Sequence, residues 1–593
     1  MYALWYGHTS VLKNTGEILL SVNENKHRDG RLTERKMNNR TAKKLVGLFV
    51  VVVLALVGLA VRITVINATE GEKYARIVMT QAQQQYDSRT IAFRRGDITD
   101  RNGTVLAASN LVYNLILDCS VLNTEVENQD GTTEKRYLDP TVDALVRVLG
   151  MNEAEIRKKL TDPETQDSQY QILLNNVQPD VKQKWEDYLN TDSEENADLS
   201  EEDKRKRDNI RGVWFEEVYS RIYPLDSVAC DVVGFTYDGT TAEWGIEGYY
   251  SDILNGTNGR QYGYFNTDAE AGQTIIPAVD GRNIISTIDV NIQEIIREAL
   301  ENFNAEMATD ANKTNGAQNI GVIVMDPDTG EILGMDSNKW YDLNHPQDLS
   351  AYYTEEQITA MDDTDTMLNL SEIWKNFCIS DAYEPGSVFK PVTIAAARAT
   401  GSAKKDDTFI CDGGEQVEDK YIQCDIYPAS HGTQTIQESL MHSCNDALMQ
   451  IASGQGASNF LKYQEIFGFG MKTGIDLPGE NAGLLFEQSQ LRPVELATSS
   501  FGQGFTCTMI QEAAAICSVI NGGYYYKPHV VKEVTDSSGA LIASSEPILE
   551  RRTVSEGISK EIREAMGTVL TMEGTGYLAK IPGYTMGGKT GTA

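Results

Sequence analysis

One uncharged run constrains this chain more than any other sequence feature. It covers residues 45–61 and continues beyond Arg62 to residue 66. The whole stretch is therefore close to the roughly 20 residues that a bilayer-spanning helix needs. Arg62 lies near one end, where its long side chain can reach the membrane interface. A cleaved signal peptide and a buried core helix are the alternatives, but the run is long for a signal sequence and no small-x-small cleavage site follows it. We predict a transmembrane anchor at residues 44–66.

Basic residues before this run predict its orientation. Seven of them lie between residues 28 and 44: Arg28, Arg31, Arg35, Lys36, Arg40, Lys43 and Lys44. A cationic flank stays in the cytoplasm. We therefore expect a single-pass protein of the cell membrane, with a cytoplasmic tail at residues 1–43 and everything after about residue 67 outside. Met37 is an alternative start of translation, and in that case residues 1–36 would not belong to the protein.

Composition excludes some function classes. The 593 residues are 41% hydrophobic, which is enough for several packed domains, and the formal net charge is −34. Such acidity argues against nucleic-acid binding, which depends on basic contacts to phosphate. The eight cysteines are scattered, with no C-x-x-C pair and no His/Cys cluster at zinc-ligand spacing. Cys411 and Cys424 can pair outside the cell, and free buried thiols are the alternative.

The outer part divides into two blocks. Residues 67–275 show mixed strand and helix patterns, and the charged insertion at 190–210 is expected to be an exposed loop. From residue 276 onward, strand-like runs such as GVIVMD (321–326) alternate with helical runs such as FKPVTIAAARA (389–399). This alternation predicts an α+β or α/β architecture.

The motif S-x-x-K occurs three times, and its context separates the copies. Ser10 precedes the anchor, on the cytoplasmic side. Ser402 lies where a helix should end, and the negative end of a helix disfavours an anionic nucleophile. Ser387 follows a Glu-Pro-Gly turn at a helix start, where free N–H groups favour negative charge. Lys390 is one helical turn from Ser387 and can take its proton if burial or nearby cations lower the lysine pKa. We predict Ser387 as nucleophile and Lys390 as base.

The motif S-x-N occurs twice, and only the copy at Ser443 lies on the outer side. Ser21 precedes the anchor. Ser443 can pass a proton between the nucleophile and a leaving group, and Asn445 can hold a substrate amide with one donor and one acceptor. A helix N-cap is the alternative role, because serine and asparagine are preferred there.

The motif K-T-G also occurs twice. Lys472 lies in a Gly- and Pro-rich stretch that reads as a loop, and we exclude it. Lys589 follows YTMGG, a strand-like approach whose backbone can pair with an extended peptide. Gly591 allows that backbone to come close. Lys589, with Thr590 and Thr592, can bind a C-terminal carboxylate.

These motifs and a series of landmarks occur in the order found in one protein family. The landmarks are RRGDITDRNGTVLA (94–107), RIYP (221–224), EWGIEGYYSDILNGTNGR (243–260), STIDVNIQ (286–293), MDPDTGEILGM (325–335), YEPGSVFKPVT (383–393), HGTQT (431–435), GIDLPGE (474–480), GQG (502–504) and NGG (521–523). The chain from the anchor to its last residue resembles the class B (monofunctional) penicillin-binding proteins, close to the division and sporulation types.

The resemblance implies a fold. It implies an α+β chain with a non-catalytic pedestal, or dimerisation-type, domain at 67–275 and a penicillin-binding transpeptidase domain at 276–593. The latter consists of an antiparallel sheet with helices and an all-helical subdomain. The family continues beyond its K-T-G strand with further strands and a closing helix. We therefore expect this chain to be incomplete at its C-terminus, which bears on its activity and hides any accessory modules.

The resemblance also implies a reaction, that of a serine-type peptidoglycan D,D-transpeptidase. Ser387 attacks the penultimate D-Ala carbonyl of a stem peptide and releases the terminal D-Ala, and an amine from a neighbouring strand resolves the acyl-enzyme. The backbone N–H groups of Ser387 and Thr592 form the oxyanion hole. β-Lactams acylate Ser387. Neither a metal nor an organic cofactor is needed, and the implied partner is a membrane glycosyltransferase of the shape, elongation, division and sporulation type.

Other functions share the same motifs. A D,D-carboxypeptidase differs only in its acceptor, which is water. A β-lactamase or β-lactam sensor is a further alternative, although the large pedestal argues against a simple β-lactamase. An inactive wall-assembly scaffold would fit an incomplete chain. The sequence leaves open a role in division, elongation or sporulation, the oligomeric state, and whether Cys444 is redox-sensitive or a buried inert thiol.

Overall fold

The computed structural model describes residues 88–592, with gaps at 129–130, 192, 194–195, 197, 264–272 and 309–316, and in addition Val53, Leu56 and Leu59. The predicted anchor at 44–66 lies outside the described residues except for these three, which are helical and exposed. No helix among the described residues has both the length and the apolar character of a membrane span. The predicted cytoplasmic tail lies outside the described residues as well.

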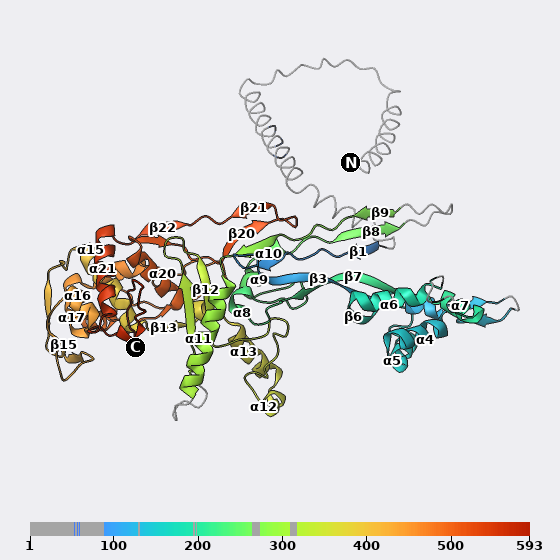
Figure 1. Ribbon diagram of the computed structural model, residues 1–593, viewed down its shortest axis with the longest axis horizontal. Helices are drawn as coiled ribbons and strands as arrows, with labels where there is room; N and C mark the ends of the chain where they lie inside the picture. The colour runs from blue at the N-terminus through green and yellow to red at the C-terminus, as the bar shows by residue number, and fades with distance from the viewer. Residues whose placement is uncertain are drawn as a thin grey trace, which may run out of the picture. The chain divides into compact units, whose positions relative to one another are not determined.

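A seven-stranded sheet brings early and late parts of the chain together (Figure 1). In spatial order its strands are β21 (Leu541–Ser544), β20 (Val531–Thr535), β10 (Asn283–Ser286), β2 (Ile98–Thr99), β3 (Val105–Leu117) and β6 (Gln171–Val177), and β7 (Val213–Ile222) also pairs with β3. Strand β10 runs parallel to β2 and antiparallel to β20. The short strand β10 therefore links the two blocks expected from the sequence.

Strand β3 is the longest strand of this sheet and organises the first block. It pairs with β7 from Ala108 to Leu117. The second half of β3 is apolar at nearly every position because helices cover it: Leu115 and Leu117 are fully buried against α3 and the helices that follow. These helices are α3 (Cys119–Asn123), α4 (Leu138–Leu149), α5 (Glu153–Thr161) and α6 (Pro179–Leu189). Trp185 of α6 is the largest side chain of this core.

The charged insertion contains a helix, so the predicted loop is wrong in part. Helix α7 (Glu201–Asp208) has no buried residue. It is N-capped by Ser200, whose side chain accepts from the N–H of Asp203. Its first turn is acidic and its last turn basic, which complements the helix dipole, and Lys206 pairs with Glu202 one turn away. The cap, the charge pattern and the contact of Arg207 with Tyr188 therefore stabilise a solvated helix where polarity suggested a loop.

A buried ion cluster joins three of the sequence landmarks. The Glu247 carboxylate accepts from Arg95 Nε and Arg221 Nε, each at 2.7 Å, and from the Tyr223 hydroxyl at 3.2 Å. The three charged side chains are at most 2% exposed. Glu247 lies in α9 (Gly245–Tyr249) and Arg221 lies in β7, whereas Arg95 precedes β2. Charged groups are tolerated inside this core only because all three are paired with one another.

Smaller elements complete this block. They are the sheet β1 (Ser88–Ile91), β8 (Gly259–Gly263) and β9 (Gln273–Ile276), the pair β4 (Val126–Glu127) and β5 (Thr133–Glu134), and the helices α8 (Cys230–Val233) and α10 (Ser251–Leu254).

The second block confirms the strand predicted at 321–326 and the helix predicted at 389–399. They are β11 (Gly321–Met325) and α15 (Lys390–Thr400). The α+β class is confirmed. Strands β20 and β21 join the seven-stranded sheet, but the other strands described after residue 320 form separate two-stranded pairs instead of the expected single antiparallel sheet. The pairs are β11 with β12 (Ile332–Ser337), β13 (Ala382–Tyr383) with β18 (Cys507–Thr508), β14 (Thr408–Cys411) with β17 (Gly432–Thr435), β15 (Gly414–Val417) with β16 (Lys420–Gln423), and β19 (Tyr524–Tyr526) with β22 (Leu549–Arg552). Most are two to five residues long, and helix α20 (Met509–Ile520) packs against both β11 and β19.

Helix α15 lies among several other helices of this block. Its residues Lys390 to Ala397 are all buried, and it packs against α17, α18, α20 and α21. The other helices are α11 (Val290–Ala308), α12 (Glu355–Ala360), α13 (Asp363–Trp374), α14 (Phe377–Ser380), α16 (Ile436–Met441), α17 (Asn445–Gln455), α18 (Ala457–Ile466), α19 (Pro493–Ser499) and α21 (Glu556–Val569), with 3₁₀ turns η2 (Gly386–Phe389) and η3 (Tyr577–Ala579). The N-terminus of α15 is therefore held from several sides.

Candidate functional site

Ser387 lies in the 3₁₀ turn η2, directly before α15. In a 3₁₀ turn, residues three apart stand one above the other, so Ser387 and Lys390 share one side of the chain. Phe389 anchors the turn: its ring packs edge-on against Phe460, Phe469 and Phe505 at 4.9 to 5.9 Å. The predicted helix start at Ser387 is thus a 3₁₀ turn leading into the helix.

Lys390 reaches the S-x-N motif. Its Nζ donates to Ser443 Oγ at 3.1 Å, to Asn445 Oδ1 at 2.7 Å and to the backbone carbonyl of Ser443. The side chain is fully buried, and this burial lowers the pKa of Lys390 to about 8. A lysine with that pKa has a usable neutral fraction near neutral pH and can act as a base. Among the described residues, the Ser387 hydroxyl makes no hydrogen bond to Lys390 or Ser443. Catalytic hydrogen bonds of this kind often form only when substrate binds.

Ser443 occupies a strained position between two helices. Its φ is +55°, a left-handed conformation that is uncommon for a residue other than glycine. Helix α16 ends before it, and α17 begins at Asn445. The N-cap of α17 is Cys444, whose Sγ accepts from the N–H of Ala447, so neither Ser443 nor Asn445 takes the capping role that the sequence left open. Both polar side chains are free to face the lysines.

Lys589 of the K-T-G motif meets the same serine. Its Nζ donates to Ser443 Oγ at 2.8 Å and to the Thr590 carbonyl at 2.8 Å. Burial, and then the positive charge of Lys390, lower the pKa of Lys589 to about 7. A bound anion would favour the charged form of this lysine.

The rest of the K-T-G segment lies against the Ser387 turn. A Cβ on Gly591 would come within 2.7 Å of Val388 Cγ2, so the Gly591 backbone lies close to the Val388 side chain. Thr590 Oγ1 bonds to Thr575 Oγ1 at 2.9 Å, and Thr592 follows in exposed backbone. The predicted strand before Lys589 is wrong for the described residues: 585–592 have no strand partner, and Gly588 bonds to the Met566 carbonyl at the end of α21 instead.

The GQG landmark supports the nucleophile turn, a role that sequence reasoning did not assign. Gly386 N–H donates to the Gly502 carbonyl at 3.0 Å, and the N–H of Gly504 donates to Glu384 Oε1 at 3.0 Å. Gly502 has φ +88°, and a Cβ there would lie 2.0 Å from the Gly386 carbonyl oxygen. Only glycine fits at this position. The S-x-x-K, S-x-N and K-T-G motifs, from which the site was predicted, do not indicate this contact.

The rejected motif copies lie elsewhere. Ser402 follows the end of α15, is exposed and donates to the Ala397 carbonyl. Lys472 is exposed in a loop, whereas its neighbour Thr473 is buried against Glu480. The copies at Ser10 and Ser21 lie outside the described residues.

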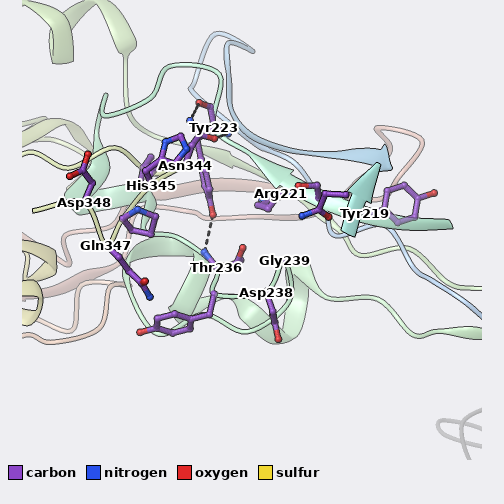
Figure 2. Close-up of a pocket in the computed structure, with 15 residues that line it drawn as sticks. Tyr219, Arg221, Tyr223, Thr236, Asp238, Gly239, Asn344, His345, Gln347 and Asp348 are labelled. Carbon is purple, nitrogen blue, oxygen red and sulfur yellow. Dashed lines mark hydrogen bonds between the residues drawn. The ribbon is translucent and has the colours of Figure 1, made fainter. Parts of the chain in front are cut away.

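One described pocket lies away from these motifs. It has a volume of about 760 Å³ and is lined by residues of β7, by the loop near Asp238 and by residues 343–348. Figure 2 shows the Tyr223 hydroxyl accepting from the Thr236 N–H across it, at 3.0 Å. No residue of the three motifs is among the described residues that line it, so motif geometry, and not cavity size, defines the candidate site.

All eight cysteines are free, so Cys411 and Cys424 do not form the disulfide that the sequence left open, and the alternative of buried thiols holds for these two. The structure instead gathers Cys411, Cys424, His431 and Cys444 into one cluster of metal-binding atoms. Their spacing along the chain has no zinc-ligand pattern, which is why sequence reasoning missed the cluster. Cys444 lies between Ser443 and Asn445.

Two family models match most of the chain. Residues 320–593 match the penicillin binding protein transpeptidase domain, and residues 90–285 match the penicillin-binding protein dimerisation domain.

Curated relatives match over nearly the full length. Stage V sporulation protein D of Bacillus subtilis is 31% identical over 573 residues, covering 94% of this chain and 77% of that protein. A probable peptidoglycan D,D-transpeptidase PenA of Neisseria meningitidis is 25% identical, covering 90% and 78%. Two solved structures share the fold: a peptidoglycan synthetase from Bifidobacterium adolescentis (TM-score 0.62, 23% identity, covering 86% of each chain) and penicillin binding protein 2X from Streptococcus thermophilus (TM-score 0.61, 22% identity, covering 82% of this chain and 66% of that one).

Proposed function

The chain belongs to the class B penicillin-binding proteins, a family of serine-type peptidoglycan D,D-transpeptidases, and we propose that Ser387 is the nucleophile with which it cross-links stem peptides. One observation carries the proposal. Lys390 and Lys589, from two motifs about 200 residues apart, both donate to Ser443 Oγ of the third motif, beside the turn that holds Ser387.

Acylation uses the buried lysine as base. Neutral Lys390 takes the proton of Ser387 Oγ as the oxygen bonds to the penultimate D-Ala carbonyl carbon. The carbon–nitrogen bond to the terminal D-Ala then breaks, and its nitrogen receives a proton through Ser443, which contacts both lysines. The terminal D-Ala leaves as a free amino acid, and the peptide remains as an ester on Ser387.

The second half of the reaction repeats these transfers in reverse. The amine of a neighbouring stem peptide attacks the ester carbonyl, loses its surplus proton to the Lys390–Ser443 relay and forms an amide. The Ser387–carbonyl bond breaks, and Ser387 Oγ regains its proton. β-Lactams enter the same first step and leave a stable acyl group on Ser387.

Substrate binding falls to the two other motifs. Charged Lys589, with the hydroxyls of Thr590 and Thr592, binds the terminal carboxylate, and Asn445 holds a substrate amide. The N–H groups of Ser387 and Thr592 stabilise the oxyanion. The contact of Gly591 with Val388 supports this arrangement, because it brings the K-T-G backbone against the nucleophile turn.

The domain layout and location follow the family. We propose a membrane anchor at 44–66, a pedestal at 67–275 and a transpeptidase domain with an all-helical subdomain at 276–593, working outside the cell beside a membrane glycosyltransferase. The uncharged run at 45–61 supports the anchor. Deleting residues 45–66 should release the chain from the membrane fraction, and a deletion variant that stays in the membranes would refute the anchor.

Fluorescent penicillin tests the nucleophile. Ser387→Ala should abolish labelling, whereas Ser402→Ala, which alters the other outer S-x-x-K, should label like the unmodified chain. In the same way Lys589→Ala should slow labelling and Lys472→Ala should not. Removing the base in Lys390→Ala should slow labelling by about 10²- to 10⁴-fold. Labelling that survives Ser387→Ala would refute the assignment.

A further inference from the structure

Four potential metal ligands meet beside the S-x-N motif, and the reaction above uses none of them. Cys411 ends β14, Cys424 follows β16, His431 precedes β17 and Cys444 caps α17. Their three sulfur atoms and one ring nitrogen all lie within 4.8 Å of one another. The cysteines are at most 2% exposed. The ends of three strands and of one helix therefore meet at one point.

The distances fit a tetrahedral ion. Cys424 Sγ lies 3.8 Å from Cys444 Sγ, and His431 Nδ1 lies 3.5 Å from Cys411 Sγ and 3.9 Å from Cys424 Sγ. Zinc bonds of about 2.3 Å to sulfur and about 2.0 Å to nitrogen, at tetrahedral angles, place two sulfurs about 3.8 Å apart and a sulfur and nitrogen about 3.6 Å apart. The ligands stand close to these separations already.

A disulfide accounts for fewer of these atoms. The sulfurs of Cys424 and Cys444 lie in non-bonded contact at 3.8 Å, against about 2.05 Å in a disulfide, so the two thiols are unlinked here. A bond between those two would also leave Cys411 and His431 with no role. Three thiolates and one imidazole form a closed four-ligand set, which is typical of structural zinc and leaves no open position for a reacting water.

The surroundings provide donors to the sulfur of Cys444. The N–H of Ala447, in the first turn of α17, donates to Cys444 Sγ at 3.4 Å. Gln434 is 1% exposed, its side chain lies against the Cys444 thiol, and its amide nitrogen has no hydrogen-bond partner among the described residues. A thiolate at Cys444 would give that nitrogen an acceptor. Gln434 is itself oriented through its Oε1, which pairs with His442 Nδ1 at 2.9 Å, and His442 stacks on His431.

We propose that Cys411, Cys424, His431 and Cys444 bind one Zn²⁺ ion that holds the S-x-N motif in its working geometry. Cys444 connects Ser443 to Asn445, so fixing its sulfur fixes the backbone on both sides, including the strained Ser443. Binding needs no oxidant: each thiol loses a proton to solvent as its sulfur bonds to the ion. These four are positioning residues, and the consequence for catalysis rests on the function proposed above.

Metal content tests the site itself. The purified chain should contain about one zinc per molecule, and Cys411→Ser and His431→Ala should lose it. Cys517→Ser, which alters a cysteine outside the cluster, should keep it, and so should His431→Cys, which preserves four ligands. Cobalt in place of zinc should give the intense visible absorption of a tetrahedral thiolate site. Ser387→Ala should also bind one zinc, so this measurement is independent of the nucleophile.

Penicillin labelling tests the role of the ion. Removing zinc with a chelator should slow labelling about tenfold or more, and returning Zn²⁺ should restore it, with His431→Cys behaving like the unmodified chain. A chain that purifies without zinc and does not take it up would overturn the site, as would a Cys424–Cys444 disulfide found by mass spectrometry without reduction. Equal labelling rates with and without zinc would overturn the positioning role.

Discussion

Two lysines share one hydroxyl at the centre of the site. Lys390 is fully buried, and Lys589 is partly buried next to it, so neither charge is well solvated when both are present. Their pKa values fall to about 8 and about 7. The roles proposed for them require different protonation states, because Lys390 must be neutral to accept a proton and Lys589 must be charged to bind a carboxylate.

This difference predicts a bell-shaped pH profile. The second-order rate of acylation by penicillin depends on the fraction of chains in which Lys390 is neutral while Lys589 is charged. Because the pKa of Lys390 is about 8 and that of Lys589 is about 7, this fraction is small and is greatest between these two values. The rate should therefore rise as pH approaches about 7 and fall above about pH 8. The measurement is the labelling rate across pH 5.5 to 9.5, expressed as an apparent kcat/KM.

Two variants check the assignment of the limbs. Lys589→Ala should be slower throughout and should lose the alkaline fall, whereas Lys472→Ala should keep the whole profile. A profile that stays flat between pH 6 and 9 would show that neither lysine titrates in the rate-determining step.

Gly502 gives a second prediction at this scale. Gly502→Ala places a methyl group 2.0 Å from the Gly386 carbonyl oxygen, so the nucleophile turn must move. Gly401→Ala is the matched control, because its φ of +74° carries a similar backbone penalty of about 1 kcal/mol with no atom within 4 Å of the new Cβ. We expect Gly502→Ala to lose most penicillin labelling and Gly401→Ala to retain it. Equal labelling of both variants would show that the GQG contact does not support the site.

The residue scale also shows what sequence could and could not supply. Order and context singled out Ser387 among three S-x-x-K copies because helix polarity is a local property. The hydrogen bond of Lys589 to Ser443 and the contact of Gly502 with Gly386 join residues more than 100 positions apart. The members of the Cys444 cluster lie within 33 positions of one another, but they too meet only because the intervening loops fold back. Such pairs depend on how loops close in space, which local patterns do not encode.

At the element scale, the buried Glu247 cluster secures the first block. Removing one member leaves the other charges buried without a partner, which costs about 3–5 kcal/mol. Glu247→Ala should therefore reduce the free energy of unfolding by that amount, measured by urea denaturation. Glu153→Ala is the control: it breaks the exposed pair with Arg157, worth less than about 1 kcal/mol. Similar losses for the two variants would mean that the cluster contributes no more than a surface pair.

Elements were predicted best where one physical signal dominated. The apolar run of β11 and the small-residue pattern of α15 each matched the structure. Helix α7 was missed because its stability comes from capping and charge placement with no buried face. The strand before Lys589 was wrong because a strand needs a partner, and residues 585–592 have none among the described residues.

At the scale of the whole described unit, β10 connects the two blocks. Ile284 pairs with Ile98 of β2 on one side and with Val534 of β20 on the other, and it is fully buried. One hydrophobic core contains residues of both blocks, among them Ile98, Phe235 and Ile510. Blocks that share a sheet and a core should unfold together.

Ile284→Ala tests this coupling. The lost side chain leaves a cavity between three strands, which should cost about 2–5 kcal/mol, and hydrogen exchange should become faster in both β3 and α15 by a similar factor. Ile275→Ala, at an exposed position of β9, should change neither, within about 0.5 kcal/mol. If exchange accelerates in β3 while α15 keeps its protection, the two blocks unfold independently. Strand β10 would then connect them without coupling their stabilities.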